Sequence, residues 1–176
     1  MPRSDYVRPV AAEDVDDLAK LAREIWHQHY PAIISLDQIE YMLVQRYAPS
    51  EVRAQLTNTD HGWWVGEDDG KLTAFAHAVL MPDHCKLDKL YVHPAHQHQG
   101  LGAALLKQVS NWARSSGRNR LVLQVNRHNA LALKAYRKYG FRIIESRVCD
   151  IGGGYVMDDH FMELTLDQTI SKSHGR

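Results

Sequence analysis

The segment from Lys86 to Leu106 limits what this chain can fold into more than any other part of the sequence. It reads KLDKLYVHPAHQHQGLGAALL: a strand-like run leads through a short loop to two glycines and then to an apolar-periodic helix. Gly100 and Gly102 have no side chains where this helix begins, so several backbone amides there are unpaired and accessible. Free amides and the positive end of the helix dipole favour an anion, most naturally a phosphate or pyrophosphate. The segment therefore predicts an α/β fold with an anion site at a strand-to-helix turn.

Two common phosphate-binding motifs do not fit this segment. A Walker A loop needs Gly-Lys-Ser or Gly-Lys-Thr, and neither is present. A dinucleotide-binding fingerprint needs a third glycine at the position that Leu105 occupies. The pattern that remains is Gln-x-x-Gly-x-Gly, from Gln97 to Gly102. Taken alone, such a glycine pair could also form a simple tight turn.

The remaining sequence predicts one mixed α/β domain. Apolar residues at helical spacing predict helices over 15–26, 36–47, 100–116 and 129–139, with a further short helix capped by Ser50. Strands are expected over 6–10, 63–66, 72–80, 85–92, 121–125, 141–148 and 155–166, the last two joined by a turn of three glycines. Regular alternation along 85–92 would place Leu87 and Lys89 on one face and Asp88 and Leu90 on the other.

Charge and composition weaken several classes of function. Lys plus Arg equals Asp plus Glu at 21 each, so bulk charge gives no reason to expect nucleic-acid or membrane binding. No apolar run approaches the ~20 residues of a membrane span, and the first six residues lack the apolar stretch of a signal peptide. Cys85 and Cys149 form neither a metal spacing nor a disulfide framework, so a cytoplasmic protein is expected. The polar residues 167–176 are expected to be a disordered tail.

Several segments together resemble the GNAT superfamily of acetyl-CoA-dependent N-acetyltransferases. QHQGLG is similar to their pyrophosphate loop, and it follows LYVHP, which is similar to their splayed fourth strand. NRHNALALKAYRKYGF, residues 126–141, resembles their second motif, and VRPVAAEDVDDLAKL resembles their first strand and helix. The resemblance covers residues 6–166. It implies a single GNAT-type α/β domain, with a mixed central sheet of about six to seven strands and helices on both faces.

The same resemblance implies acetyl-CoA (coenzyme A) as co-substrate and no metal. Asn129 would reach the pantetheine or its phosphate, although it could also serve only as a helix N-cap. His93, His96 and His98 belong to no strand or helix that would aim them at one ion, so they are expected to be solvated loop residues. The backbones of Leu90, Tyr91 and Val92 would pair with the pantetheine arm, and the amides of Gln97, His98, Gln99, Gly100, Leu101, Gly102 and Ala103 would hold the pyrophosphate.

In the family reaction an amine attacks the thioester directly, within a ternary complex. Tyr136 would lie near the sulfur and give its proton to the leaving thiolate, although its spacing also fits a core aromatic beside Phe141. Many relatives have a glutamate base near the position of Lys86; Asp88, two residues on, is the first candidate here. The other candidates for the base are Glu24, His27, Tyr30 and Asp158. The acceptor site is expected to draw on Trp26, Tyr30, Tyr155 and Asp158.

The acceptor is expected to be a small amine, a polyamine, an amino-acid derivative or a peptide N-terminus. Two other classes of function remain open at this point: a sensor that holds acyl-CoA without turnover, and a nucleotide-phosphate binder unrelated to coenzyme A. The sequence does not decide between a monomer and a homodimer.

Overall fold

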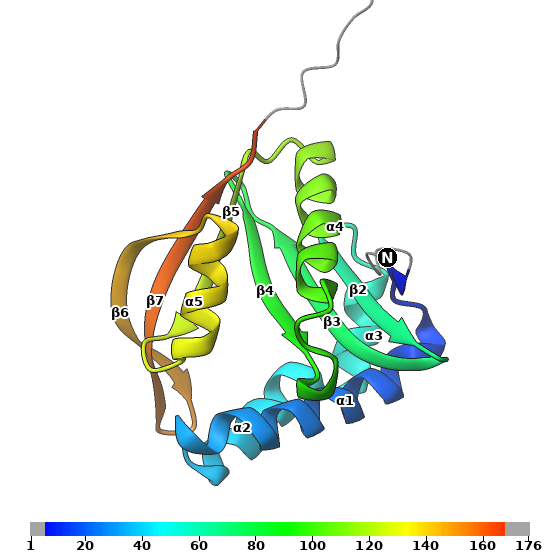
Figure 1. The fold of residues 1–176 in the computed structure, drawn as a ribbon. Coiled ribbons are helices and arrows are strands. Elements are labelled where there is room, and N and C mark those ends of the chain that lie inside the picture. Colours follow the sequence, from blue (N-terminus) through cyan, green and yellow to red (C-terminus); the bar gives the residue numbers. More distant parts are fainter. Residues whose placement is uncertain (1–5, 168–176) are drawn as a thin grey trace, which may run out of the picture.

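Seven strands form one mixed sheet in the order β1-β2-β3-β4-β5-β7-β6 in the computed structural model, which describes residues 6–167 (Figure 1). Strands β4 and β5 are parallel neighbours, and the other neighbouring pairs are antiparallel. The strands are β1 (Val7–Pro9), β2 (His61–Asp68), β3 (Lys71–Leu80), β4 (Cys85–Val92), β5 (Arg120–Asn126), β6 (Arg142–Gly152) and β7 (Tyr155–Thr165).

Within residues 6–167, five α-helices cover the two faces of this sheet. The first face carries α1 (Val15–His29), α2 (Leu36–Tyr47) and α3 (Pro49–Leu56). The second carries α4 (Leu101–Ser115) and α5 (Ala130–Tyr139), drawn in front of the sheet in Figure 1. The predicted mixed sheet with helices on both faces is confirmed.

Local sequence explains where several of these helices begin and end. The side chain of Ser35 accepts a hydrogen bond from the amide of Gln38 and so caps α2, as the sequence predicts. The short helix after it differs from the prediction: Pro49 opens α3 behind an N-cap at Ala48, because proline at the first helical position loses no hydrogen bond.

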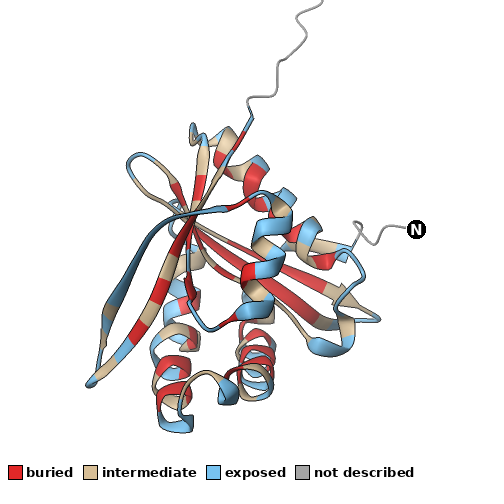
Figure 2. Ribbon diagram, turned by 60° about the vertical axis from the view of Figure 1, so that its left-hand side comes forward, coloured by how far each residue is buried: buried red, intermediate tan, exposed pale blue. Residues whose placement is uncertain are grey.

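Two apolar cores hold the layers together. Beneath α4, a row of small side chains from β3 leaves room for Leu105 and Leu101 to pack close to the sheet. On the opposite face, Trp26 of α1 and Phe75 of β3 are completely or almost completely buried between the helices and the sheet. Figure 2 shows these buried stretches on the central strands, whereas β6 at the edge of the sheet is largely exposed.

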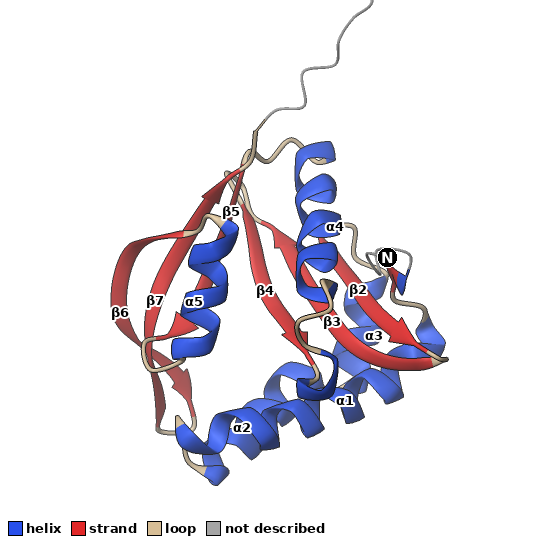
Figure 3. Ribbon diagram, in the orientation of Figure 1, coloured by secondary structure: helices blue, strands red, loops and turns tan. Residues whose placement is uncertain are grey.

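The sheet opens between its two parallel strands. β4 and β5 pair only at Cys85 with Leu121 and at Lys86 with Val122. Beyond these pairs the two strands diverge, as Figure 3 shows. The splayed strand expected from the resemblance is therefore present, and it has an open backbone edge from Leu90 to Val92 on the β5 side.

Strand β4 also departs from regular alternation. His77 pairs with Lys89 but Ala78 pairs with Leu87, so Asp88 is an extra residue, a β-bulge. The expectation that Leu87 and Lys89 share a face is wrong for this reason. Leu87 packs into the α4 core, whereas Lys89 faces the α1–α3 layer together with Asp88.

None of the helices within residues 6–167 combines the length and the apolar character needed to span a membrane. Of the tail expected at 167–176, only Asp167 lies within the described residues.

Candidate active site

The glycine-rich turn lies at the start of α4, where the sequence analysis expects an anion. Gly100 is the N-cap of α4 and has a φ of 83°, a left-handed conformation that glycine adopts without strain. A Cβ on Gly102 would lie 2.9 Å from the hydroxyl of Tyr139, so the second glycine also permits close packing against α5. The first turn of α4 contains no acidic residue. Its free amides and the helix dipole therefore keep the positive character that an anion needs.

The open edge of β4 leads away from this turn. Leu90 and Val92 pair with β3 on one side and pack against the α4 core, while Tyr91 points to the opposite face. The hydroxyl of Tyr91 lies 2.9 Å from the hydroxyl of Tyr30. Gln97 donates a hydrogen bond to the carbonyl of Val92 at 3.2 Å, which joins the end of β4 to the glycine-rich turn.

Tyr136 belongs to α5, which follows β5 in the chain, and Asn129 directly precedes this helix. The Oδ1 atom of Asn129 accepts a hydrogen bond from the amide of Ala132 and lies 3.0 Å from Nε2 of His29. Asn129 is therefore the N-cap of α5, which is one of the two roles that the sequence analysis predicts for it. The ring of Tyr136 lies 5.5 Å from that of Phe141 in an edge arrangement, and burial raises the pKa of its phenol. The hydroxyl thus keeps its proton at neutral pH.

A cavity of about 350 Å³ opens on the α1–α3 face of the sheet. Its walls come from α2, α3, β4 and the end of β6, and it lies on the face opposite α4. The lining residues are Tyr41, Met42, Gln45, Arg46, Glu51, Gln55, Lys86, Asp88, Lys89 and Ile151.

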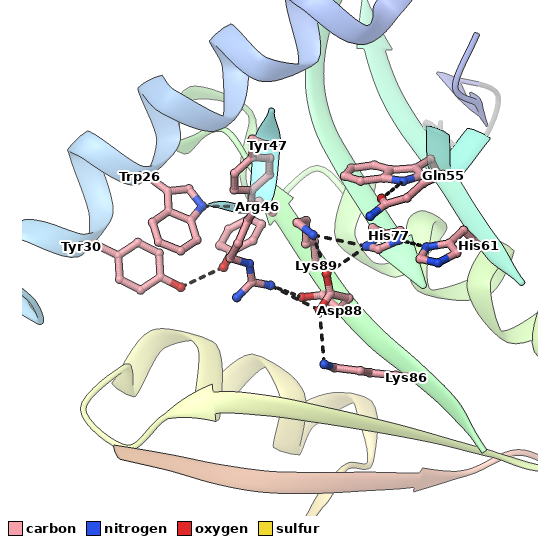
Figure 4. Close-up of polar contacts among 12 residues, drawn as sticks. Trp26, Tyr30, Arg46, Tyr47, Gln55, His61, His77, Lys86, Asp88 and Lys89 are labelled. Atoms are coloured by element: carbon pink, nitrogen blue, oxygen red, sulfur yellow. Dashed lines mark hydrogen bonds and ion pairs between the residues drawn. The ribbon is translucent and has the colours of Figure 1, made fainter. Parts of the chain in front are cut away.

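Asp88 stands at the centre of a cluster of cations in this cavity (Figure 4). Its Oδ2 atom contacts the ammonium of Lys89 and lies 2.9 Å from Nδ1 of His77. Its Oδ1 atom lies 3.4 Å from Nη2 of Arg46 and 3.6 Å from the ammonium of Lys86. The bulge is what allows Asp88 and Lys89, adjacent in sequence, to share one face.

These contacts determine the charge states in the cluster. Burial alone would raise the pKa of Asp88, but the hydrogen bond from His77 and the charges of Lys89 and Arg46 bring it well below the usual range. Burial lowers the pKa of Lys89 to about 8, although Asp88 opposes the shift. Burial would also lower the pKa of Arg46, yet the surrounding negative groups, Asp88 first among them, raise it. At neutral pH Asp88 is therefore a carboxylate held by cations.

His77 is a member of the site that the sequence analysis missed. It is 2% exposed, and burial lowers its pKa to about 4, so the imidazole is neutral. A neutral ring beside a carboxylate donates from Nδ1 to Asp88, and its Nε2 atom then accepts from Nδ1 of His61 at 2.9 Å. The ring also stacks on Trp63 with centroids 4.3 Å apart. The one signal in the sequence is a histidine in the otherwise apolar run of β3.

The residues expected at the acceptor site occupy different environments. Trp26 is 1% exposed and donates a hydrogen bond to the hydroxyl of Tyr47, so it lies behind the cavity wall. Tyr30 is buried beside Tyr91. Tyr155 packs its ring 5.1 Å from that of Tyr41, which does line the cavity.

Three of the candidate bases already have ionic partners. Asp158 lies 3.2 Å from Nε of Arg127. Glu24 lies 2.9 Å from Nε2 of His93, away from the cavity lining. His27 lies 2.8 Å from a carboxylate oxygen of Glu40.

Asp159 differs from its neighbour Asp158, one of the candidate bases, because its side chain is buried. It is 6% exposed, and its Oδ1 atom has no hydrogen-bond partner among residues 6–167. Burial raises its pKa to about 6 against the opposing charges of Arg46 and Lys86. The doublet Asp158-Asp159 was visible in the sequence, but which of the two carboxylates faces inward depends on the pairing of β7 with β5.

The loop histidines do not form a metal site in the part of the chain described. The rings of His93 and His96 are 6.0 Å apart, and His96 faces Asp68 at 3.6 Å. Residues 6–167 contain no group of three or more His, Cys, Asp or Glu side chains arranged to hold a metal ion.

Comparison with known proteins adds information about the whole chain. The profile of the Acetyltransferase (GNAT) family matches residues 18–141. A spermidine N(1)-acetyltransferase from Thermoplasma acidophilum is 26% identical over 160 residues, which cover 88% of this chain and 96% of that protein. An L-methionine sulfoximine/L-methionine sulfone acetyltransferase from Salmonella typhimurium is 35% identical over 114 residues, 59% of this chain and 64% of that one.

A solved structure shares the fold over nearly the whole length. The PaiA N-acetyltransferase from Thermoplasma acidophilum, solved in complex with coenzyme A, superposes with a TM-score of 0.79 at 24% identity. The match covers 90% of this chain and 97% of that chain.

Proposed function

Because the chain belongs to the GNAT family of acetyl-CoA-dependent N-acetyltransferases, we propose that it acetylates a primary amine that also carries a carboxylate and that binds in the cavity around Asp88. The observation that carries the choice of acceptor is the cluster of Arg46, Lys86 and Lys89 against one buried carboxylate.

Acetyl-CoA has a place that the fold provides. Its pyrophosphate would bind the amides of Gln97–Ala103 at the start of α4. The pantetheine would run along the open edge of Leu90–Val92, where β4 lacks a strand partner on its β5 side among residues 6–167. The thioester would then reach the bulge at Asp88, where the opening between β4 and β5 gives access to the other face of the sheet. The amide of Leu90 or of a neighbour would stabilise the developing oxyanion.

Charge favours an acceptor with a carboxylate over a polyamine. Three cations line the cavity, and its acidic residues are Asp88 and Glu51, of which Glu51 is exposed. Arg46 uses only its Nη2 atom in these contacts, and its Nε–H is buried without a hydrogen-bond partner within residues 6–167. An arginine with an unused donor is well suited to bind a carboxylate. A polycation such as spermidine would be repelled by the net positive charge of the cavity lining.

The relatives are consistent with more than one acceptor class. The long match acetylates spermidine, as its name states, and the shorter one acts on methionine derivatives. Both bind amines, but only the second class carries a carboxylate. The charges of this cavity favour the second class.

Transfer would proceed by direct attack. The neutral amine attacks the thioester carbonyl, a C–N bond forms, and the C–S bond breaks. Tyr136 would give its proton to the thiolate of coenzyme A, since its phenol remains protonated.

Two assays test this function in sequence. Acetyl-CoA should raise the melting temperature, and thiol release should then be measured with amino acids, diamines, aminoglycosides and short peptides. The sharpest pair is an amino acid and its carboxamide, which differ in the carboxylate alone. We expect KM to rise about tenfold or more for the carboxamide, as the loss of one charge-assisted contact predicts. Faster turnover of spermidine than of every amino acid would overturn the acceptor class.

An acyl-CoA sensor is the second candidate, and the partners that hold both oxygens of Asp88 favour it. Thermal stabilisation by acetyl-CoA without thiol release from any amine in the panel would select the sensor.

A further inference from the structure

Asp159 is a buried carboxylate on β7, the strand next to β5 on the side away from β4. It lies on β7 opposite Asn126, the last residue of β5, at a level where β5 no longer pairs with β4. Its side chain is 6% exposed, and its Oδ1 atom has no hydrogen-bond partner within residues 6–167. An ionisable group left unsatisfied in the interior of a sheet is costly, and such groups are concentrated at functional sites.

Helix α2 places Arg46 across the opening between β4 and β5. Gln38 and Arg46 lie two turns apart on one face of the helix. Gln38 donates to the carbonyl of Val156 on β7, whereas Arg46 donates to the carbonyl of Asp88 on β4. The helix therefore bridges β7 and β4. Met157 on β7 contacts Gln38 of this helix. Asp159 lies two residues further along β7, so its side chain is on the same face of the strand as Met157.

The charged neighbours of Asp159 come from three directions. Arg46 on α2 and Lys86 on β4 act on its charge, and both line the cavity. Burial raises the pKa of Tyr91 on β4, the strand that would carry the pantetheine, and the charge of Asp159 adds to this rise. From β7 itself Asp158 acts on it as a like charge, and Arg147 is its register partner on β6, with the guanidinium stacked on Phe161.

We propose that Asp159, rather than Asp88, accepts the proton from the acceptor amine. The proposal rests on the function proposed above. The acceptor would lie between the carboxylate of Asp159 and the guanidinium of Arg46, with its ammonium toward the first and its carboxylate toward the second. Oδ1 of Asp159 and Nε of Arg46 have no hydrogen-bond partner within residues 6–167, and the two side chains carry charges opposite to those of the groups that they would bind.

The proton balance is complete with these residues. Asp159 takes one proton from the ammonium and leaves a neutral amine, which attacks the carbonyl carbon. After the C–N bond forms, the nitrogen still carries one proton too many, and this proton replaces the one that Tyr136 gives to the thiolate. The C–S bond breaks, and the products are the acetylated amine and coenzyme A as a thiol. Asp159 then releases its proton to water.

Asp88 is less suited to this role. Its two oxygens contact three cations and His77, and these partners stabilise the carboxylate against protonation. A general base works best when its pKa lies near the working pH, and burial moves the pKa of Asp159 in that direction.

The test compares Asp159→Asn with Glu163→Gln. Glu163 is a carboxylate on the same strand, but it forms ion pairs with Arg120 and Arg142 outside the cavity. We expect kcat to fall about 100-fold or more in Asp159→Asn and to stay within about twofold in Glu163→Gln. The melting-temperature shift with acetyl-CoA should persist in both variants. The acidic limb of the wild-type kcat profile should disappear in Asp159→Asn and return in Asp159→Glu.

A kcat for Asp159→Asn within tenfold of wild type, or an unchanged acidic limb, overturns the proposal while leaving the acetyltransferase function intact. If Asp159→Asn does not fold, the wild-type profile decides: its acidic limb must coincide with the titration of Asp159 followed by carbon NMR, and a separation of more than one pH unit refutes the role. If wild-type protein transfers acetyl to no amine, the proposed function fails first and this role fails with it.

Discussion

The Nδ1 atom of His77 on β3 lies 2.9 Å from Oδ2 of Asp88 on the neighbouring strand β4, on the face of the sheet that carries the cavity. The same ring lies 2.9 Å from His61 through Nε2 and stacks on Trp63. His77 thus supports the carboxylate from the side away from Arg46, and this fixes the direction in which Asp88 meets the cations.

We expect His77 to remain neutral through the physiological range. Burial lowers its pKa to about 4, so its nitrogen chemical shifts in NMR should stay those of one neutral tautomer, protonated at Nδ1, from pH 5 to pH 8. An exposed histidine measured in the same spectra, His98, provides the comparison. A titration of His77 above pH 6 would show that the direction of its hydrogen bonds is assigned wrongly.

Replacing Asp88 should destabilise the fold. Asp88→Asn removes the buried negative charge that contacts Arg46, Lys86 and Lys89, and the loss of one partner from a buried ionic group costs about 3 kcal/mol. Urea unfolding at pH 7 measures the free energy. Asp83→Asn, an exposed carboxylate beside Arg120, should leave stability unchanged and serves as the control. Equal stabilities of wild type and Asp88→Asn would contradict the importance of the cluster.

Tyr136→Phe should separate chemistry from binding. The phenol has no hydrogen-bond partner among the described residues, and its ring contact with Phe141 survives the change. We expect kcat to fall by about 100-fold, a usual size for a lost general acid, with the acetyl-CoA thermal shift retained. Tyr6→Phe, at an exposed position, is the control. Unchanged turnover would leave Tyr136 as a core aromatic.

Gly102→Ala should weaken binding of acetyl-CoA with little effect on folding. The new methyl group would lie 2.9 Å from the hydroxyl of Tyr139 and would also stand among the amides proposed to hold the pyrophosphate. We expect the dissociation constant, from calorimetry, to rise about tenfold, which corresponds to about 1.4 kcal/mol. The double variant with Tyr139→Phe removes the clash and distinguishes it from interference with the phosphates. Recovery of affinity in that variant would mean that the clash alone was responsible.

Asp159→Asn should stabilise the protein near neutral pH. Burial raises the pKa of the folded carboxyl to about 6, so the native state binds more protons than the unfolded state between about pH 4 and pH 6. Stability contributed by the protonated carboxyl is therefore lost as pH rises through this window. The variant should gain about 1–2 kcal/mol over wild type at pH 7.5 and almost nothing at pH 4 in urea unfolding. A gain that does not depend on pH would contradict this linkage.

Much of the fold could be predicted because its signals are local. Helical spacing of apolar residues located α1, α2, α4 and α5, and Ser35 marked the start of α2 through its capping box. The Gly100 turn was likewise readable from the sequence, because a helix start with two glycines has few structural alternatives.

The features that could not be predicted depend on pairing between distant strands. Whether Lys89 lies beside Leu87 or beside Asp88 is decided by how β3 aligns with β4. Whether Asp158 or Asp159 is buried is decided in the same way by β5 and β7. The spacing of residues within one strand does not determine how that strand aligns with its neighbour. The ionic cluster around Asp88 and the burial of Asp159 could therefore be identified only from the structure.

The extra residue in β4 makes the length of this strand part of its chemistry. Removing Asp88 or Lys89 would restore an even two-residue rhythm with β3 and would leave Leu87 and Leu90 on the α4 face. Such a deletion would take away one of the two adjacent charged side chains that only a bulge can place on the same face. A strand shortened by one residue should therefore keep its apolar side and lose the ionic one.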